Sequence, residues 1–169
     1  MNIKKTILII LVILLSVSLL SAATYKKPIK RGVAKTFVMK DMYLTPQIGL
    51  YSGAVPFGAN IELALTENIG VGATLMMWFG SGYSVFMPQV DAAYHFTMLE
   101  VDKLDLFAGV GVGFAIAGSG GGTSGIAISP FIAVRYWFSE KMGISLRSNI
   151  GIIGDWTGVS SMLGVVFNI

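Results

Sequence analysis

Apolar and polar residues alternate along most of this chain. In the segment "LDLFAGVGVGFAIAG", residues 104–118, every second residue from Leu104 to Ile116 is apolar, and most residues between them are Gly or Ala. Successive side chains of a β-strand point to opposite faces, so a period of two predicts a strand. One face of this strand is apolar and the other is nearly bare, and the two faces are therefore expected to meet different surroundings.

The same period of two recurs in eight segments of about ten residues. Turn-forming sequences such as "TEN", "SEK" and "GSGGGTSG" separate them. The expected strands are 42–51, 57–65, 69–79, 86–96, 104–118, 126–138, 142–151 and 158–169. Eight antiparallel strands can close into a barrel, and closure leaves no unpaired edge. The pattern predicts an all-β chain that forms an eight-stranded antiparallel up-and-down barrel.

The polar faces indicate on which side of the barrel the apolar face lies. A soluble, lipocalin-like barrel points its apolar face inward, whereas a membrane barrel points it outward into lipid. The charged or ionisable residues of the polar faces are Glu62, Asp91, His95, Asp105, Arg135 and Arg147. A water-exposed surface carries far more charge than this, and the whole chain is 54% hydrophobic and only 12% charged. We therefore predict a transmembrane barrel whose bare face lines a crowded lumen.

Aromatic residues of the apolar face fall near the two ends of the strands. One set is Phe57, Phe79, Phe86 and Phe114, and the other is Tyr94, Phe96, Tyr136, Phe138 and Phe167. Ten residues of a strand tilted by about 40° rise roughly 25 Å, which is the height of the apolar band of an outer-membrane barrel. The two sets are therefore interpreted as girdles at the two membrane interfaces.

The N-terminal region has the pattern of a secretory signal peptide. Lys4 and Lys5 precede an apolar run from Ile7 to Leu20, and the small residues 21–23 follow it. We expect cleavage after residue 23, in preference to an uncleaved anchor. Three parts are predicted: a signal peptide (1–23), a basic flexible periplasmic segment (24–40) and a transmembrane barrel (41–169).

The segment 24–40 contains only basic charges, whereas all nine acidic residues of the chain lie from Asp41 onward. Two interpretations stay open for it. The segment contacts anionic lipid headgroups, or it is a solvated leader to the first strand.

The inward residues are expected to fill the lumen and to pair their charges. Buried charges are tolerated when they are paired. If His95 lies opposite Asp105 and Asp105 meets Arg135, then Gly109 falls opposite Phe131 and makes room for its ring. A second group is expected nearer mid-height and consists of Glu62, Asp91 and Arg147. Trp78, Phe131 and Trp137 are expected to plug the lumen. The alternative is a water-filled lumen in which the charges are solvated.

From residue 41 to its end, the chain resembles the small eight-stranded outer-membrane barrels of the outer-membrane protein A and X class. The resemblance rests on the alternating architecture and on the terminal sequence "GVVFNI", in which Phe167 and Ile169 keep the alternation although the last residue is not aromatic. It implies a place in the cell outer membrane, with lipid and the barrel-assembly machinery as partners. We expect a monomer whose 52–56, 80–85, 117–125 and 152–157 loops face outside.

Candidate chemistry is sparse in this sequence. Cysteine is absent, so disulfides and thiol catalysis are excluded, and no His and carboxylate cluster has metal-ligand spacing. His95 is the single histidine and has no serine beside it on its strand, so we expect no enzyme, no catalytic residue and no cofactor, and a lipid-modifying enzyme is the least favoured function. No nucleic-acid motif is present. The favoured function is a structural or interaction protein with a plugged lumen, and the alternative is a narrow channel for small solutes.

Overall fold

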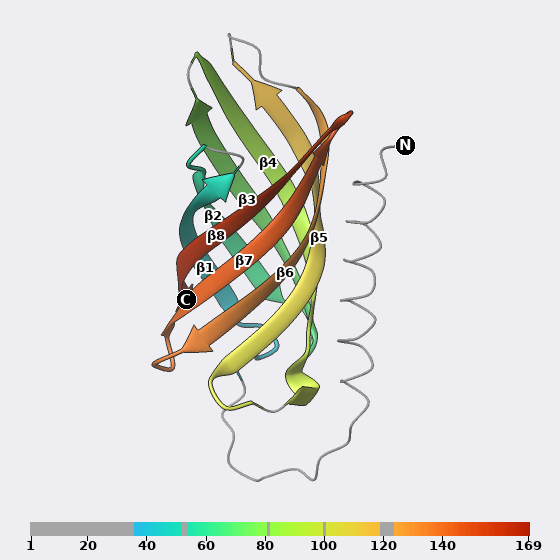
Figure 1. The fold of residues 1–169 in the computed structure, drawn as a ribbon. Helices are drawn as coiled ribbons and strands as arrows, with labels where there is room; N and C mark the ends of the chain where they lie inside the picture. The colour runs from blue at the N-terminus through green and yellow to red at the C-terminus, as the bar shows by residue number, and fades with distance from the viewer. Residues whose placement is uncertain (1–35, 52–53, 81, 100, 119–123) are drawn as a thin grey trace.

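The computed structural model describes residues 36–51, 54–80, 82–99, 101–118 and 124–169, and they form one closed antiparallel barrel (Figure 1). Each strand pairs with the next one along the chain, and β8 pairs with β1. The elements are β1 (Met42–Tyr51), β2 (Phe57–Ala64), β3 (Ile69–Gly80), β4 (Tyr83–His95), the 3-10 turn η1 (Thr97–Leu99), β5 (Leu104–Ala117), β6 (Gly125–Trp137), β7 (Met142–Ile153) and β8 (Trp156–Asn168). The predicted fold is confirmed, and its strand boundaries differ from the expected ones by only a few residues.

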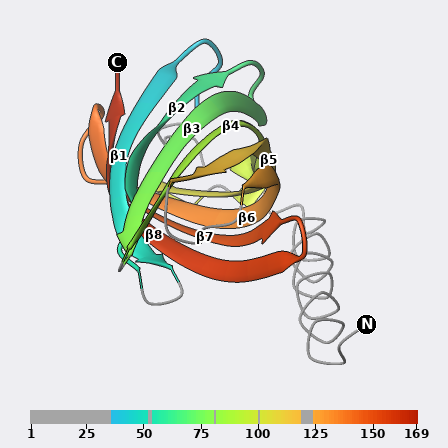
Figure 2. The same ribbon diagram turned by 90° about the horizontal axis from the view of Figure 1, so that it is seen from above.

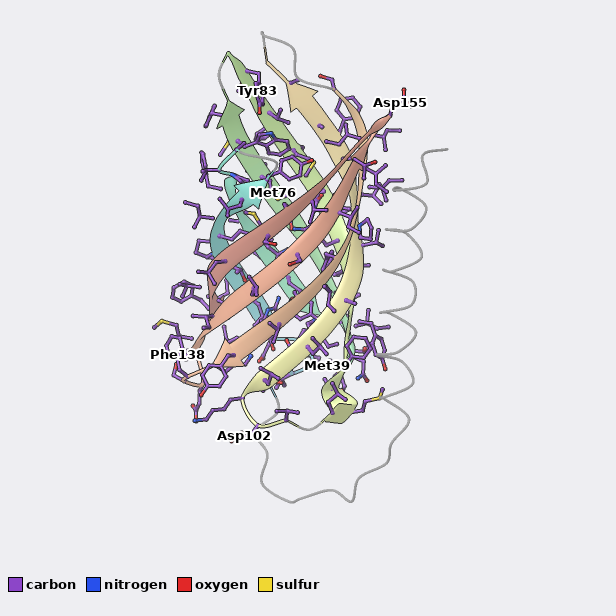
Figure 3. All side chains as sticks on the ribbon, in the orientation of Figure 1. Met39, Met76, Tyr83, Asp102, Phe138 and Asp155 are labelled. Atoms are coloured by element: carbon purple, nitrogen blue, oxygen red, sulfur yellow. The ribbon has the colours of Figure 1, made fainter. Side chains whose placement is uncertain are left out.

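The two chain ends of the barrel meet at the same end of the molecule. The Ile169 N–H donates to the Met42 carbonyl at 2.9 Å, and the Asn168 amide donates to the Asp41 carboxylate at 2.8 Å. We call this the strap end, because residues 36–41 cross it, and the opposite end the loop end. Figure 3 shows Met39, Asp102 and Phe138 near the strap end and Tyr83 and Asp155 near the loop end.

The alternation of the sequence becomes the division between the outside and the inside of the wall. Viewed from above, the strands form a ring (Figure 2). Outward positions of the described strands carry no charged side chain, and most are exposed apolar residues such as Ile48, Val90 and Leu163. The charged residues of the strands all point into the lumen and are buried. The outer wall is thus a surface suited to hydrocarbon and not to water. Within the described residues, no helix is long and apolar enough to span a membrane.

Most of the predicted girdle residues lie on the outer surface. Phe79 at the loop end is 60% exposed, and Tyr136 and Phe138 at the strap end are similarly open. Phe57 and Phe79 also contact each other, with ring centroids 5.8 Å apart. Phe86, Phe114 and Tyr94 are exposed as expected, and Phe167 is half-buried.

Phe96 does not belong to the exposed girdle and corrects that expectation. It follows the last residue of β4, is only 8% exposed and packs edge-on against Tyr94 at 5.3 Å. The chain turns into η1 directly after it, where the Leu99 N–H donates to the Phe96 carbonyl. The strand pattern therefore ends one residue too early to keep this ring on the outer wall.

The expected N-terminal division is only partly within the described residues. The signal peptide (1–23) and most of the basic segment (24–40) lie outside them. Residues 36–40, which were expected to be flexible, pack on the barrel: Phe37 is 1% exposed and the Lys40 N–H donates to the Ala64 carbonyl at 2.8 Å. Residues 36–40 are therefore corrected to an ordered part of the barrel, and the rest of the basic segment lies outside the described residues.

Candidate functional site

A cluster of four ionisable side chains lies inside the barrel toward the strap end. The charge cluster, as we call it, consists of Glu62 from β2, His95 from β4, Asp105 from β5 and Arg135 from β6. Its four members are almost completely buried, and His95 has no exposed surface. Four strands thus bring their charges to one place, where they can pair out of contact with solvent.

His95 lies between two carboxylates in this cluster. Its Nδ1 is 2.9 Å from Asp105 Oδ1, and its Nε2 is 3.0 Å from Glu62 Oε1. Ionised carboxylates only accept hydrogen bonds, so a ring that is protonated on both nitrogens satisfies both contacts. With that ring, two positive and two negative groups balance within the cluster.

Arg135 completes the cluster from the far side of the lumen. Its guanidinium donates to Glu62 Oε2, and its second terminal nitrogen lies 3.5 Å from Asp105 Oδ2. The same guanidinium lies over the Phe107 ring, 4.3 Å from its centroid. Ion pairing and a cation–π contact therefore stabilise one buried cation.

The predicted strand register holds for the hairpin of β5 and β6 and is wrong by two residues for the hairpin of β4 and β5. Asp105 pairs with Arg135 and Gly109 pairs with Phe131, as expected. His95, however, lies opposite Phe107 and not opposite Asp105. The turn at residues 96–103 is longer than a simple hairpin because it contains η1, and this shifts the register. The His95 side chain still reaches Asp105 diagonally.

A second polar group, the middle group, lies at mid-height around Asp91 and Arg147. Two Arg147 nitrogens lie 3.2 and 3.3 Å from the Asp91 carboxylate oxygens. Asp91 also accepts hydrogen bonds from Asn60, Thr74 and Gln89. Glu62 was expected here and is corrected to the charge cluster, because its carboxylate contacts His95 and Arg135 instead.

Aromatic rings separate the two polar groups. The Arg147 guanidinium lies 3.6 Å from the Phe131 centroid, and Phe131 contacts Phe107 edge-on at 6.2 Å. A Cβ added at Gly109 would lie only 2.6 Å from Phe131 Cζ. The bare strand face predicted from the glycines therefore leaves room for this ring.

Apolar side chains fill the lumen at the loop end. Tyr51 and Trp78 pack edge-on at 5.0 Å, and Met76 and Met87 belong to the same buried cluster. The cavity left between these residues measures about 10 Å³, room for about one water molecule. Trp78 thus lies in the plug, as expected from the sequence. We call these residues the loop-end plug.

Trp137 and Phe131, the other two predicted plug residues, lie at different heights. Trp137 is near the strap end, where it packs with Tyr43 at 5.7 Å and shares a buried cluster with Phe37. Phe131 lies at mid-height against Arg147. Tyr43 and Phe37 are buried here as well. Alternation places Tyr43 on the inward face of its strand, whereas Phe37 precedes the first strand and has no such signal.

The surroundings of His95 define what chemistry this site can support. The contacts of this ring within the described residues are two carboxylates and the rings of Phe37 and Phe107, and no hydroxyl nucleophile is among them. Within those same residues, no group of three or more His, Cys, Asp or Glu side chains is arranged to hold a metal ion. The charges around His95 are paired with one another, and the side chains around them are closely packed.

The sequence matches no protein-family model and no curated protein. Its fold is similar to that of several solved structures. The N-terminal β-barrel domain of Pseudomonas aeruginosa OprF has a TM-score of 0.64 at 15% identity, covering 78% of this chain and 98% of that domain. The outer membrane protein OprG from the same organism has a TM-score of 0.60 at 8% identity, covering 82% and 99%. The outer membrane enzyme PagL has a TM-score of 0.50 at 15% identity, covering 75% and 99%.

These similarities define the class of fold. The chain has the closed eight-stranded architecture of the small outer-membrane β-barrels. At such low identity the likeness extends to the fold alone, and the role of the protein must be argued from its own lumen and surface.

Proposed function

We propose that this protein is an outer-membrane β-barrel with a structural or interaction role and a lumen that conducts no solutes. The uncharged, apolar outer wall supports the membrane location, because a soluble barrel would expose charge there. The girdle aromatics near both strand ends support the same placement. In this proposal the strap end faces the periplasm and the short loops of the other end face outside.

The packing of side chains inside the barrel is the observation that supports a sealed lumen. Three consecutive layers fill the barrel: the charge cluster with the rings above and below it, the middle group, and the loop-end plug, where about 10 Å³ stays open. A conducting pore needs a continuous polar path wider than a water molecule, and the packing of the described lumen residues argues against one. The protein then acts through its outer wall, its ends and its stability in the membrane.

A narrow channel is the second candidate, and one specific observation favours it. Six lumen side chains carry buried polar atoms without a hydrogen-bond partner in the described chain, namely Thr45, Gln47, Gln89, Ser129, Arg135 and Trp137. Buried polar atoms without a partner favour bound water, and water molecules at several of these atoms would together form a polar path through the lumen. The packed layers outweigh this observation, because the rings and thioethers of the loop-end plug close one end of the lumen.

A non-enzymatic role is part of the proposal. Both ring nitrogens of His95 are engaged by carboxylates, so this ring offers no free base. The likeness to the enzyme PagL concerns the fold and brings no catalytic residue to this chain. We further propose a monomer that is inserted by the barrel-assembly machinery through its C-terminal strand, in which Phe167 and Ile169 keep the outward alternation.

Conductance in planar bilayers tests the proposal. The refolded wild-type protein is expected to show no steady open state across a wide range of voltages. The matched variant is Trp78→Ala with Phe37→Ala, which removes one ring from each end and is expected to give measurable openings. A large, steady conductance of the wild-type protein would reject the sealed lumen and establish the channel.

A further inference from the structure

The segment that precedes the first strand crosses the strap end of the barrel. The Val38 N–H donates to the Tyr43 hydroxyl at 3.0 Å, the Lys40 N–H donates to the Ala64 carbonyl, and the Thr36 hydroxyl is 3.5 Å from the Leu104 carbonyl. Residues 36–41, the strap, therefore run from β5 to β1 and β2 across the mouth. Asp41 anchors the end of the strap nearest β1, where its carbonyl accepts from the Ala64 N–H and its carboxylate accepts from Asn168 and Tyr43. Before Asp41, the strap makes its hydrogen bonds to the barrel through Thr36, Val38 and Lys40.

One strap side chain enters the lumen. Phe37 is 1% exposed and stacks on the His95 ring, with centroids 3.5 Å apart and planes within 9°. His95 stacks on Phe107 from the other side at 4.6 Å. The histidine of the charge cluster is thus enclosed between a ring of the wall and a ring of the strap.

The neighbours of Phe37 in the strap do not share its burial. Val38 is 38% and Met39 is 48% exposed, and both lie outside the barrel mouth. Beside the strap lies a pocket of about 370 Å³, whose lining includes Thr36 and Val38 of the strap and Trp137 and Phe138 of the barrel. The strap therefore leaves part of the mouth open, and Phe37 is the strap side chain that covers the buried charges, beside Tyr43 and Trp137 of the wall.

We propose that the strap is a displaceable cover of the strap end of the lumen, and we call a strap with this role the cork. With Phe37 in place the charge cluster is dry; with Phe37 withdrawn a one-sided vestibule opens down to His95, while the loop-end plug stays closed. The position of the strap then determines whether the buried charges meet solvent. This inference goes beyond the proposed function, since it concerns access from one end and not conduction through the barrel.

Single cysteines can report access from each end separately, because the chain contains no cysteine. Ala64 shares the buried cluster of Phe37 and Trp137, whereas Ala115 is buried in the loop-end plug with Trp78. The experiment introduces Ala64→Cys or Ala115→Cys in the full-length barrel in lipid and measures the labelling rate with a small, charged methanethiosulfonate reagent. Circular dichroism and heat-modifiable gel migration establish that each variant is folded.

If the strap is a cork, a change at each end of the lumen should affect only the cysteine at that end. Phe37→Ala should speed labelling at Ala64→Cys by at least about tenfold and leave Ala115→Cys slow, whereas Trp78→Ala should do the reverse. Tyr43→Phe keeps the ring but removes the hydroxyl that holds the Val38 N–H, so it should speed labelling at Ala64→Cys while leaving Phe37 itself intact. This second variant loosens the strap without making a cavity.

The outcomes separate the cork from the proposed sealed lumen. If Ala64→Cys is labelled as slowly with Phe37→Ala and with Tyr43→Phe as in the otherwise wild-type chain, the strap is no cork. The proposal of a sealed lumen is unaffected by that result. If both reporters label quickly with all rings present, the lumen is wet and the cork and the sealed lumen fail together. Equal acceleration of both reporters by Phe37→Ala would also overturn the cork, because it would indicate general loosening.

Discussion

Arg135 and Glu62 face each other across the lumen from strands β6 and β2, 73 residues apart in the chain. Neither strand pairs with the other, so the contact exists only because the sheet closes. Glu62 also holds His95, and Arg135 also lies near Asp105. The pair therefore connects opposite walls of the barrel through one buried network.

Removing the cation of this network should be costly. Arg135→Met leaves Glu62 without its main positive partner in a buried site, so the free energy of unfolding should fall by about 3–5 kcal/mol. Adding Glu62→Gln should recover much of the loss. Adding Asp105→Asn should recover less, because Asp105 keeps its contact with His95. Urea unfolding in lipid vesicles, followed by tryptophan fluorescence, measures these differences as a double-mutant cycle.

Asp91→Asn provides the matched control for this cycle. Asp91 is also a buried carboxylate that is paired with an arginine, but it belongs to the middle group. Combined with Arg135→Met it should give no recovery, and the two losses should add. Recovery equal to that of Glu62→Gln would mean that only the total charge of the lumen matters and that the specific pairs do not.

The sequence predicted the wall of this barrel better than its interior. Alternation defines which side chains point inward, and hairpin neighbours such as Asp105 and Arg135 follow from strand order. Glu62 was assigned to the wrong group because its partners come from strands that do not adjoin β2, and their heights depend on the tilt and stagger of the closed sheet. Phe37 was missed because a single ring in an irregular segment has no periodicity to reveal it.

Adding one methyl group at Gly109 tests whether the lack of a side chain there makes room for the Phe131 ring. The new Cβ of Gly109→Ala would lie 2.2 Å from the Ala92 carbonyl oxygen, 2.6 Å from Phe131 Cζ and 2.9 Å from the Ala93 Cα, so ring and backbone must both move. We expect a loss of about 1–3 kcal/mol in unfolding free energy, as in other overpacked interiors. Adding Phe131→Leu should recover only part, because the backbone contact persists.

Val110→Ala is the control for this change. Val110 is the next residue of β5, points outward and is 41% exposed, so its truncation leaves the lumen packing intact. Its effect should be smaller than that of Gly109→Ala. If Gly109→Ala is neutral, the glycines of this face are not needed to accommodate the ring.

The orientation of the barrel gives a cellular prediction. Asp155 lies at the loop end (Figure 3), Glu140 lines the pocket beside the strap, and both are exposed. In intact cells, an impermeant thiol reagent should label Asp155→Cys and not Glu140→Cys. After the outer membrane is permeabilised, both should label, which shows that each site is reactive. Labelling of Glu140→Cys alone in intact cells would reverse the proposed orientation.

A final prediction tests whether the outer wall meets hydrocarbon, using two positions on one face of β5. Val110 is near the middle of the strand and Ile116 is near its loop end, and both point outward. An arginine at the bilayer midplane of a barrel costs about 2–4 kcal/mol, and near the interface about 0–1 kcal/mol. Val110→Arg should therefore lower the unfolding free energy in lipid vesicles much more than Ile116→Arg does. In a barrel whose wall faced water, both arginines would be solvated equally, so similar small effects at the two positions would contradict the membrane placement.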